Sequence, residues 1–472
     1  MRSDSHLPAQ QVDLPHQRAA EPSAPASSAV AGRNVLIVGI NYWPEPTGIA
    51  PYSTAIAEHL ALSAASVTVL TGLPSYPEWK APAEYRGRRR FRQTRNGVDI
   101  HRLWHTVPSR QDAVRRGLYE GTFFAHAAAS RPPRLPDLIV GVTPSLGGAL
   151  AAAHFGARYD APCVVVVQDL LGAAAAQTGI AGGGRVAALV GRAERHALRR
   201  ASAVVLVTDA FRATLRDYGV AEDRLHTIRN WSRSAPARRD RDAERLRLGW
   251  SDATVVLHTG NIGLKQGLAV VVEAARITRD RRDLRWVLMG DGSQRADLQR
   301  QGSDLPNLEF LPLCATEDYP EFLAAADILL LCERPSVKDM CLPSKLTSYF
   351  TSGVPVASAV SAYGSTAREL TLAGAPTPSA PGDAEALVKQ IIALSADPQL
   401  GARHGADAAQ YAHENLAFDI AAERLDAVLA AAVADHARSA PRKATRHGSG
   451  DRPPRSQGRI ATMPEGSTTD AS

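Results

Sequence analysis

Short apolar segments alternate with amphipathic segments along almost the whole chain. The first, residues 34–40 (NVLIVGI), is a continuous apolar run, and residues 52–62 (YSTAIAEHLAL) behind it have the spacing of an amphipathic helix. Continuous apolar strands separated by helices are typical of a parallel sheet that is covered on both faces. The pattern predicts further strands at 66–70, 98–104, 137–142, 162–170, 202–208, 225–230, 254–260, 284–290, 308–313, 327–332 and 354–360.

One polar stretch, residues 231–250, interrupts this alternation and marks a domain boundary. The α/β fold predicted is two doubly wound Rossmann-like domains, whose ligand sites at the carboxyl ends of the strands face one cleft. The last amphipathic segment has no strand behind it, so it either packs across the domain interface or caps its own domain. The predicted parts are a disordered tail (1–32), an N-terminal domain (33–231), a linker (232–250), a C-terminal domain (251–415), a helix (416–436) and a disordered basic tail (437–472).

Charge and composition narrow the class of protein. The 472 residues are 44% apolar and carry a net charge of +6, of which +4 lies in residues 437–472. The body of the chain is therefore nearly balanced, which does not suggest a nucleic-acid-binding protein. Four cysteines without CxxC spacing argue against a metal site or a disulfide framework, which fits the cytoplasm. No apolar run reaches the length of a membrane helix or resembles a secretion signal.

Three glycines and one lysine lie between a predicted strand and a predicted helix in residues 258–268 (HTGNIGLKQGL). Glycine lets the backbone approach a ligand closely, and the first amides of a helix have no internal partner, so such a turn suits a phosphate. The candidate residues are Asn261, Gly263 and Lys265, with Lys265 supplying a positive charge. The alternative is a tight turn that carries a solvated lysine.

Two other turns are candidates for the same ligand. In residues 332–356 the letters LPSK fall at a predicted helix start, where Ser344 can cap the helix and Lys345 adds charge. Two strand-to-helix turns with one lysine each suit a diphosphate, unless Lys345 is simply solvated. Gly290, Asp291 and Gly292 end another strand and predict a turn beneath a nucleotide base or ribose, although GDG is also a common turn.

The loop after the first strand, NYWPEPTGIAPYS, is stiffened by three prolines and has Gly48 at its tip. It is longer than most links between a strand and a helix, which favours a ligand contact at Gly48 over a plain rigid turn. The chain has no GK[ST] sequence and no GxGxxG after the first strand, so the Walker and dinucleotide motifs are both absent.

Together these stretches resemble the GT-B glycosyltransferases of the large retaining family 4, and most closely the branch that builds colanic acid-type exopolysaccharides. The resemblance spans roughly residues 34–436. The stretches that carry it are GINYWPEPTGIAPYS, TGLPSYPEW, QDLLGAAAAQTGI, IRNW, HTGNIGLKQGL, GDG and LPSKLTSYFTSGVPV.

The resemblance implies transfer of a sugar from a UDP- or GDP-sugar to a saccharide acceptor, with retention of the anomeric configuration and without a metal or other cofactor. It implies that the C-terminal domain binds the nucleotide-sugar, that Lys265 neutralises the donor diphosphate and that the amides near Ser344 support it. The N-terminal domain would bind the acceptor, in this branch typically a polyprenyl-diphosphate-linked sugar, and Gly48 would lie where the donor phosphate and the acceptor meet.

The sequence departs from the family pattern at three places. Asn261 replaces an arginine that many relatives carry in the phosphate loop. Met340 and Ser348 stand where the wider family has an E-x7-E pair of carboxylates, and Ser348 is retained as a candidate nucleotide contact. Asp169 lies near the place of a histidine and is the catalytic candidate that faces the acceptor, although an aspartate there can also simply cap the loop.

Six arginines lie between Arg86 and Arg95, in the sequence YRGRRRFRQTR. Such a run usually forms a solvated, mobile loop. In the acceptor domain, however, Arg88, Arg89 and Arg90 would also suit an anionic membrane surface, at about 1 kcal/mol each. This suggests peripheral attachment to the inner face of the cell membrane, with the arginines of residues 185–200 as a second basic face.

The function expected is therefore a retaining glycosyltransferase of surface polysaccharide assembly. Two rivals use the same fold: a nucleotide-sugar epimerase, for which no clear set of acid and base groups is present, and a non-catalytic relative that only binds nucleotide-sugar or a protein. The missing carboxylates favour the non-catalytic relative slightly, whereas the retained glycine and lysine turns argue against it.

Overall fold

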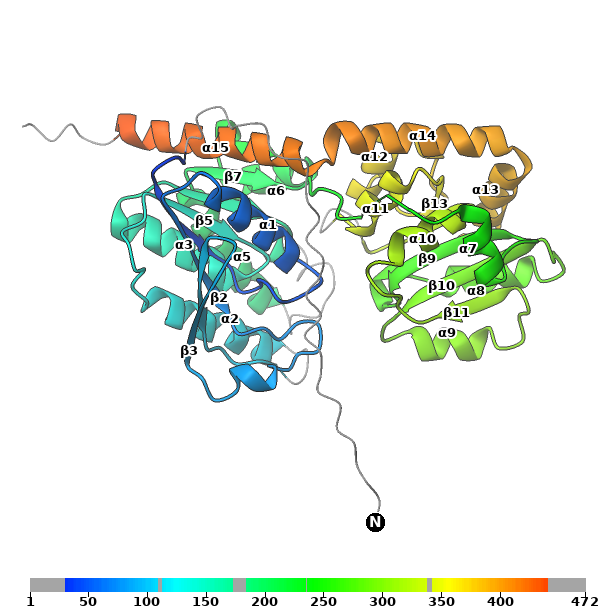
Figure 1. Ribbon diagram of the computed structural model, residues 1–472, viewed down its shortest axis with the longest axis horizontal. Helices are drawn as coiled ribbons and strands as arrows, with labels where there is room; N and C mark the ends of the chain where they lie inside the picture. Colours follow the sequence, from blue (N-terminus) through cyan, green and yellow to red (C-terminus); the bar gives the residue numbers. More distant parts are fainter. Residues whose placement is uncertain (1–29, 109–112, 173–183, 235, 338–341, 440–472) are drawn as a thin grey trace, which may run out of the picture.

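The computed structural model describes residues 30–108, 113–172, 184–234, 236–337 and 342–439, which form two α/β domains side by side (Figure 1). Most of both predicted tails lies outside the described residues. Residues 30–32 were assigned to the first tail, and this was wrong. Val30 is fully buried in the core of the N-terminal domain, and Ala31 bridges Ala64. None of the described helices is long and apolar enough to cross a membrane.

The N-terminal domain is built on a sheet of eight described strands in the order β3-β4-β2-β1-β5-β6-β7-β8. All neighbours are parallel except β3 and β4. The strands are β1 (Asn34–Val38), β2 (Ser66–Gly72), β3 (Arg90–Arg95), β4 (Val98–Leu103), β5 (Leu138–Val142), β6 (Cys163–Val167), β7 (Ala203–Leu206) and β8 (Leu225–Thr227). The helices are α1 (Ala50–Ala61), α2 (Ala113–Ala128), α3 (Leu146–Tyr159), α5 (Gly184–Arg200) and α6 (Phe211–Asp217), with short 3-10 turns η1 (Ala83–Tyr85) and η2 (Glu222–Arg224).

The C-terminal domain has a parallel sheet of five described strands in the order β11-β10-β9-β12-β13. The strands are β9 (Thr254–Asn261), β10 (Leu284–Asp291), β11 (Leu308–Leu311), β12 (Ile328–Cys332) and β13 (Val356–Ala359). The helices are α7 (Arg241–Leu248), α8 (Ala269–Ile277), α9 (Arg295–Gln301), α10 (Tyr319–Ala325), α11 (Lys345–Ser352), α12 (Ser365–Leu372), α13 (Ala384–Ala396) and α14 (Pro398–Asn415), with the 3-10 turn η3 (Leu264–Gln266).

Each sheet is buried between two layers of helices, as the continuous apolar strands predict. In the N-terminal domain, α2, α3, α5 and α6 cover one face, and α1 covers the other together with the last helix, α15 (Phe418–Ser439). In the C-terminal domain the two faces have separate apolar cores in the same way. The predicted fold class, two doubly wound Rossmann-like domains, is confirmed.

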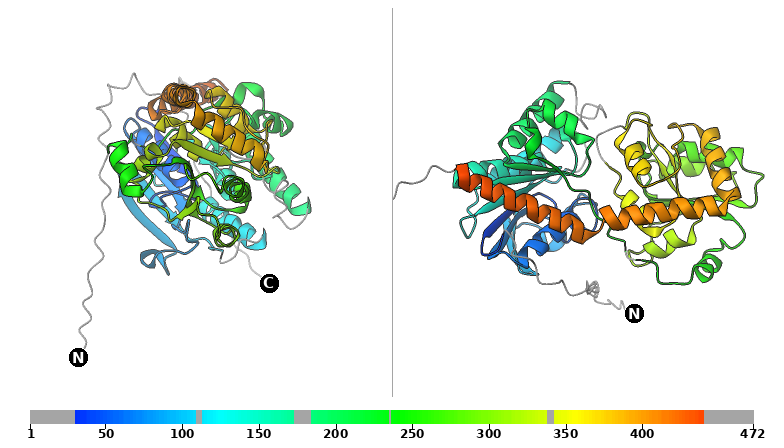
Figure 2. Two further views of the ribbon diagram at one scale, coloured as in Figure 1. Left: turned by 90° about the vertical axis from the view of Figure 1, so that its right-hand side faces the viewer. Right: turned by 90° about the horizontal axis from the view of Figure 1, so that it is seen from above.

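The last helix crosses back from the C-terminal domain to the N-terminal domain. Helices α14 and α15 run one after the other along the same side of both domains (Figure 2). Leu425 and Leu429 of α15 are buried against the sheet of the N-terminal domain. The segment in which the chain first passes from the N-terminal to the C-terminal domain lies beside the start of this helix. There the Ser232 amide donates to the Leu416 carbonyl at 2.8 Å.

The predicted linker is not an open connection. Part of it forms α7, where the buried Arg245 donates to the Ala325 carbonyl at 2.7 Å and to Asp327 at 2.9 Å. Trp250 behind α7 is fully buried in the C-terminal domain. Residues 241–250 therefore pack as part of the C-terminal domain.

Candidate functional site

The turn after β9 has the geometry that a close ligand requires. Gly260 has φ +95° and Gly267 has φ +59°, so both hold a left-handed backbone that favours glycine. Between them, Lys265 is exposed on η3 and Asn261 is exposed at the end of the strand. Gly263 packs against Asn261, whose amide nitrogen would lie 2.8 Å from a Cβ at Gly263. The three residues predicted to hold the diphosphate thus lie in one compact turn.

Gly290 and Gly292 are needed for backbone packing between strands β9 and β10. A Cβ at Gly290 would lie 1.7 Å from the Gly260 carbonyl oxygen, and one at Gly292 would lie 2.5 Å from the Ile262 carbonyl oxygen. The Ile262 amide donates to the Asp291 carbonyl at 2.8 Å. The exposed Asp291 carboxylate accepts from the Gly292 amide at 2.8 Å. The GDG turn is therefore the support on which the Gly260–Lys265 turn rests.

Lys345 begins α11, as predicted, but its ammonium group is not solvated. It donates to the Thr259 carbonyl at 2.5 Å and lies 3.2 Å from Nε2 of His258. Nδ1 of His258 lies 3.2 Å from the Leu330 carbonyl, so a neutral ring donates there and accepts from Lys345. Burial lowers the pKa of Lys345 to about 7 and also lowers that of His258.

Glu333 is a buried carboxyl group near Lys345 that the sequence reasoning missed. It follows β12 directly and accepts from the Thr366 hydroxyl at 2.9 Å. Burial raises its pKa to about 7, against the opposing effects of the Thr366 hydrogen bond and the Lys345 charge. Its place at the carboxyl end of a central strand was the available signal, since such ends form the ligand edge of the sheet.

Ser344 does not cap α11 as predicted, whereas Ser348 takes part in a polar network. Ser344 was expected to cap α11, but no side-chain cap hydrogen bond forms there, and its side chain is exposed. Ser348 lies close enough to Tyr319 to lower the pKa of its hydroxyl against the larger effect of burial, and that hydroxyl lies 3.0 Å from the Thr259 hydroxyl. Ser348 therefore belongs to the polar network beneath the end of β9. Met340 lies outside the described residues.

Asp169 of the N-terminal domain lies within range of the charge of Lys265 in the C-terminal domain. Asp169 follows β6 at the carboxyl edge of the N-terminal sheet, and its side chain is only partly exposed. The protein atoms crowded around it raise its pKa to about 7, while the charge of Lys265 opposes this shift and that of Glu194 adds to it. Two residues predicted separately from the sequence thus come within electrostatic range of each other.

The segment behind β8, IRNW, ties the two domains together beside Asp169. Asn230 and Gln168 exchange two side-chain hydrogen bonds, of 2.7 and 3.0 Å. Arg229 reaches the C-terminal domain, where its Nε lies 2.9 Å from Glu369, and Tyr411 also donates to Glu369 at 2.6 Å. Although burial acts in the opposite direction, the Glu369 carboxylate raises the pKa of Arg229.

The proline-rich loop is anchored from beneath by a buried carboxylate. Gly48 is exposed with φ +66°, and a Cβ there would lie 3.3 Å from the Tyr76 ring. Glu45 accepts from the Ser75 and Tyr76 amides at 2.8 and 2.9 Å and from the Asn41 side chain at 2.8 Å. The two loops that follow β1 and β2 are therefore held together as one unit around Gly48.

The arginine-rich segment is not wholly a loop. From Arg90 onward it forms β3, an antiparallel edge strand on β4, and this corrects the loop expectation. Side chains on β3 alternate between exposed and half-buried, a pattern that long basic side chains can adopt on an edge strand. Arg88, Arg89 and Arg90 are all exposed, and Arg88 lies over the Phe91 ring at 5.2 Å.

Within the described ranges, no group of three or more His, Cys, Asp or Glu side chains is arranged to hold a metal ion. Cys163, Cys314 and Cys332 are free thiols, and Cys341 lies outside the described residues. The polar groups of the site are instead lysines, backbone amides and isolated carboxyl groups.

Comparison with known proteins agrees with this arrangement. Residues 47–231 match the model of the Glycosyl transferase 4-like domain, and residues 253–397 match that of the Glycosyl transferases group 1. A protein of Escherichia coli (strain K12) named as the colanic acid biosynthesis glycosyl transferase WcaI is 34% identical over 337 residues, which cover 68% of this chain and 81% of WcaI. The chain belongs to the family 4 GT-B glycosyltransferases.

Solved structures with low sequence identity share the fold of this glycosyltransferase. Anabaena Alr3699/HepE in complex with UDP and glucose aligns with a TM-score of 0.60 at 16% identity, covering 84% of this chain and all of HepE. WaaG, a glycosyltransferase involved in lipopolysaccharide biosynthesis, aligns with a TM-score of 0.60 at 18% identity, covering 84% of this chain and 99% of WaaG. The predicted family and fold of the glycosyltransferase are thus confirmed.

Proposed function

We propose that this glycosyltransferase transfers a sugar from a UDP- or GDP-sugar to a lipid-linked saccharide during bacterial exopolysaccharide biosynthesis. We further propose that it retains the anomeric configuration and needs no metal ion. The position of Asp169 carries the proposal, because it follows β6 at the carboxyl edge of the N-terminal sheet, within electrostatic range of Lys265 and beside the segment whose Arg229 pairs with Glu369 of the other domain. A transfer reaction needs its donor and its acceptor in such a shared site.

The relatives support this choice of substrate and pathway. WcaI is named for colanic acid biosynthesis, and HepE was solved with UDP and glucose. The match with WcaI covers 68% of this chain and 81% of WcaI. A nucleotide-sugar donor and a role in surface polysaccharide assembly are the assignments that fit these relatives.

The chemistry assigned to the donor side is the stabilisation of negative charge. The departing nucleoside diphosphate gains charge in the transition state, and fixed cations and amides stabilise it. We assign this role to Lys265, together with the turn amide of Gly263 and the amides at the start of α11 near Ser344. Lys345 is assigned a positioning role, since its ammonium group holds the Thr259 carbonyl beneath the turn.

The chemistry assigned to the acceptor side rests on Asp169 and Gly48. A carboxyl group whose pKa is raised to about 7 is suited to accept or share a proton near neutral pH. The exposed backbone at Gly48 offers a close approach for the acceptor and the donor phosphate. Neither role requires a cofactor.

Attachment to the inner membrane face is part of the proposal, because a polyprenyl-linked acceptor is confined there. The exposed Arg88, Arg89 and Arg90 lie next to one another beside an edge strand. Replacing all three with Gln should reduce sedimentation with anionic vesicles at low salt. Unchanged sedimentation of this variant would refute the role of these arginines.

The first test of the proposal is a thermal shift with UDP, GDP, dTDP, NAD and ATP. A ligand at 100 times its dissociation constant adds about 2.7 kcal/mol to the free energy of unfolding. We expect a shift with UDP or GDP that Lys265→Ala abolishes. Lys389→Ala, which removes an exposed lysine of α13 in the same domain, is the control and should keep the shift.

Product analysis then separates transfer from the rival functions. With the nucleotide-sugar that binds, a transferase releases the nucleoside diphosphate, and the anomeric proton of the new linkage reports retention. Epimerisation of the sugar without release of nucleotide would establish the epimerase. Binding without any turnover, with lipid-linked acceptors present, would establish the non-catalytic relative.

A further inference from the structure

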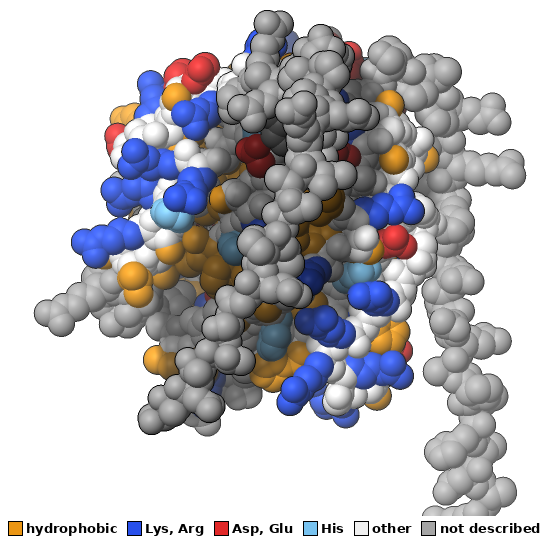
Figure 3. Space-filling model, turned by 90° about the vertical axis from the view of Figure 1, so that its left-hand side faces the viewer, with side chains coloured by type: hydrophobic (Ala, Val, Ile, Leu, Met, Phe, Trp, Pro, Cys, Tyr) orange, Lys and Arg blue, Asp and Glu red, His pale blue; other side chains and the backbone are white. Residues whose placement is uncertain are grey.

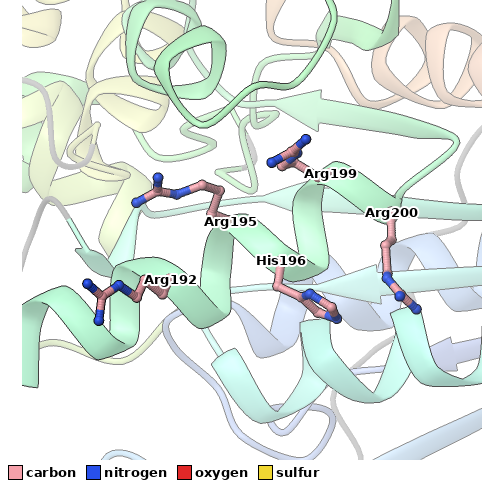
Figure 4. A pocket seen from close by; sticks show the side chains of 5 residues that line it. All are labelled: Arg192, Arg195, His196, Arg199 and Arg200. Carbon is pink, nitrogen blue, oxygen red and sulfur yellow. The ribbon is translucent and has the colours of Figure 1, made fainter.

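One helix of the N-terminal domain lines a strongly basic, open pocket of about 500 Å³ that has no part in the chemistry assigned above. Five side chains of α5 form its lining (Figure 4): Arg192, Arg195, His196, Arg199 and Arg200. All five are exposed. The same domain seen from its outer end shows many more Lys and Arg than Asp and Glu side chains (Figure 3).

The spacing of these residues places them on a single face of the helix. At about 100° and 1.5 Å per residue, positions 192 to 200 of the lining span roughly 140° of arc and about 12 Å of length. Arg195 and Arg199 project to one flank, whereas His196 and Arg200 project to the other (Figure 4). The guanidinium groups therefore surround an area larger than one phosphate group, which suits two or more neighbouring phosphates.

No carboxylate balances these charges within the described part of the chain. None of the four arginines forms an ion pair there, whereas exposed arginines such as Arg276 and Arg281 do. Favourable interaction with the helix dipole explains Arg199 and Arg200 in the last turn of α5, but not Arg192 and Arg195, which lie further back. Like charges at this spacing repel each other, so an anion would stabilise the helix.

The pocket is also held in shape by its surroundings. The Arg195 guanidinium lies over the Tyr218 ring at 5.4 Å, and Arg199 lies against Gly219. On the opposite side of α5, Glu194 is buried and accepts from the Leu171 and Gly172 amides at 2.8 and 3.0 Å. Those amides follow Asp169 closely in the chain, so one helix joins the basic pocket to the backbone of the interdomain site.

We propose that the α5 pocket is a second anion site that binds a diphosphate or closely spaced phosphate groups. Guanidinium groups bind phosphate oxygens through two parallel hydrogen bonds, and the lining offers four of them. The phosphates come either from a soluble diphosphate or from the head groups of an anionic lipid, and the exposed Leu189, one turn before Arg192, lies where a lipid surface would meet the helix.

The experiment titrates inorganic pyrophosphate into the full chain by calorimetry, with and without saturating UDP, because UDP fills the donor site but also carries a diphosphate that can compete for the pocket. The pocket variant replaces Arg192, Arg195, Arg199 and Arg200 with Gln. The control variant replaces four exposed arginines elsewhere with Gln and so loses the same charge: Arg279, Arg282, Arg403 and Arg424. We expect binding to weaken at least about tenfold in the pocket variant and to stay close to wild type in the control.

A second arm measures sedimentation of the same proteins with phosphatidylglycerol or phosphatidylcholine vesicles. Loss of phosphatidylglycerol binding in the pocket variant alone would identify lipid head groups as the source, and loss of pyrophosphate binding alone would identify a soluble diphosphate. Equal behaviour of the two variants in both arms would overturn the proposal. If the pocket variant does not fold, Arg192→Gln with Arg195→Gln tests the same point. A failure of UDP binding would count against the proposed function only, since the comparison of the two variants does not depend on it.

Discussion

Replacing Gly290 with alanine tests whether the GDG turn supports the phosphate turn through backbone packing. A Cβ at this position would lie 1.7 Å from the Gly260 carbonyl oxygen, so the ends of β9 and β10 have to move apart. The backbone angle of Gly290, φ +154°, adds strain of roughly 1 to 3 kcal/mol for any residue with a side chain. The substitution therefore acts on the carboxyl edge of the C-terminal sheet.

The loss of stability can be worked out from the hydrogen bonds that break when the two strand ends separate. The hydrogen bonds from the Ile262 amide to Asp291, at 2.8 Å, and from the Gln294 amide to Ile262, at 3.0 Å, join the two turns. Each is worth about 1 kcal/mol, so Gly290→Ala should cost about 2 kcal/mol beyond the backbone strain. For a domain of this size, that additional cost lowers the melting temperature by roughly 4 to 8 °C.

Gly382→Ala is the matched control for this prediction. Gly382 also has a positive φ, of +83°, but nothing lies within 4 Å of a Cβ there. Scanning calorimetry of the two variants, which can resolve separate transitions of the two domains, measures the difference directly. If Gly290→Ala melts at the same temperature as Gly382→Ala, the packing role inferred for Gly290 is refuted.

Three further predictions concern charged groups of the interdomain region. Glu369→Gln removes the carboxylate 2.9 Å from the partly buried Arg229, which keeps only the Asp209 carboxylate at 3.9 Å, and should cost about 2 kcal/mol. A double-mutant cycle with Arg229→Gln in thermal unfolding should show coupling above about 1 kcal/mol. The pKa of Asp169 is raised to about 7, so wild-type stability should fall relative to Asp169→Asn as the pH rises from about 4 to about 7. Transfer activity should rise over the upper part of the same range, and pH-resolved melting and turnover measure the two effects. The pKa of Lys345 is lowered to about 7, so wild-type stability should increase between about pH 7 and pH 10, and melting curves of Lys345→Met should lack this increase.

The apolar strands of both sheets could be predicted from the sequence, because a strand buried on both faces must be apolar at every position. Strand β3 was missed for the opposite reason. It lies at the edge of the sheet, its residues RFRQTR are exposed or half-buried, and its only neighbour is β4. The cost of leaving arginine in water is small, so hydropathy carries no signal for such a strand.

The candidate site was predictable where a local motif determines it and not where distant segments meet. The glycines and Lys265 of the phosphate turn lie within a few residues, and turn chemistry alone marks them. The orientation of the Lys345 side chain depends on its hydrogen bond to Thr259, which is 86 residues away in the sequence. Arg229 and its partner Glu369 are 140 residues apart in the sequence. Such contacts come from the packing of whole domains, and a single sequence does not specify them locally.

Helix α15 has a consequence for the order in which the protein is completed during synthesis. The N-terminal domain is translated first, yet part of its apolar face, over β6, stays uncovered until Leu425 and Leu429 leave the ribosome. The whole C-terminal domain is made in between, so it can finish folding before the domain that precedes it. A nascent chain stopped after residue 415 therefore displays an open hydrophobic surface, and this is the stage at which chaperones would protect it most.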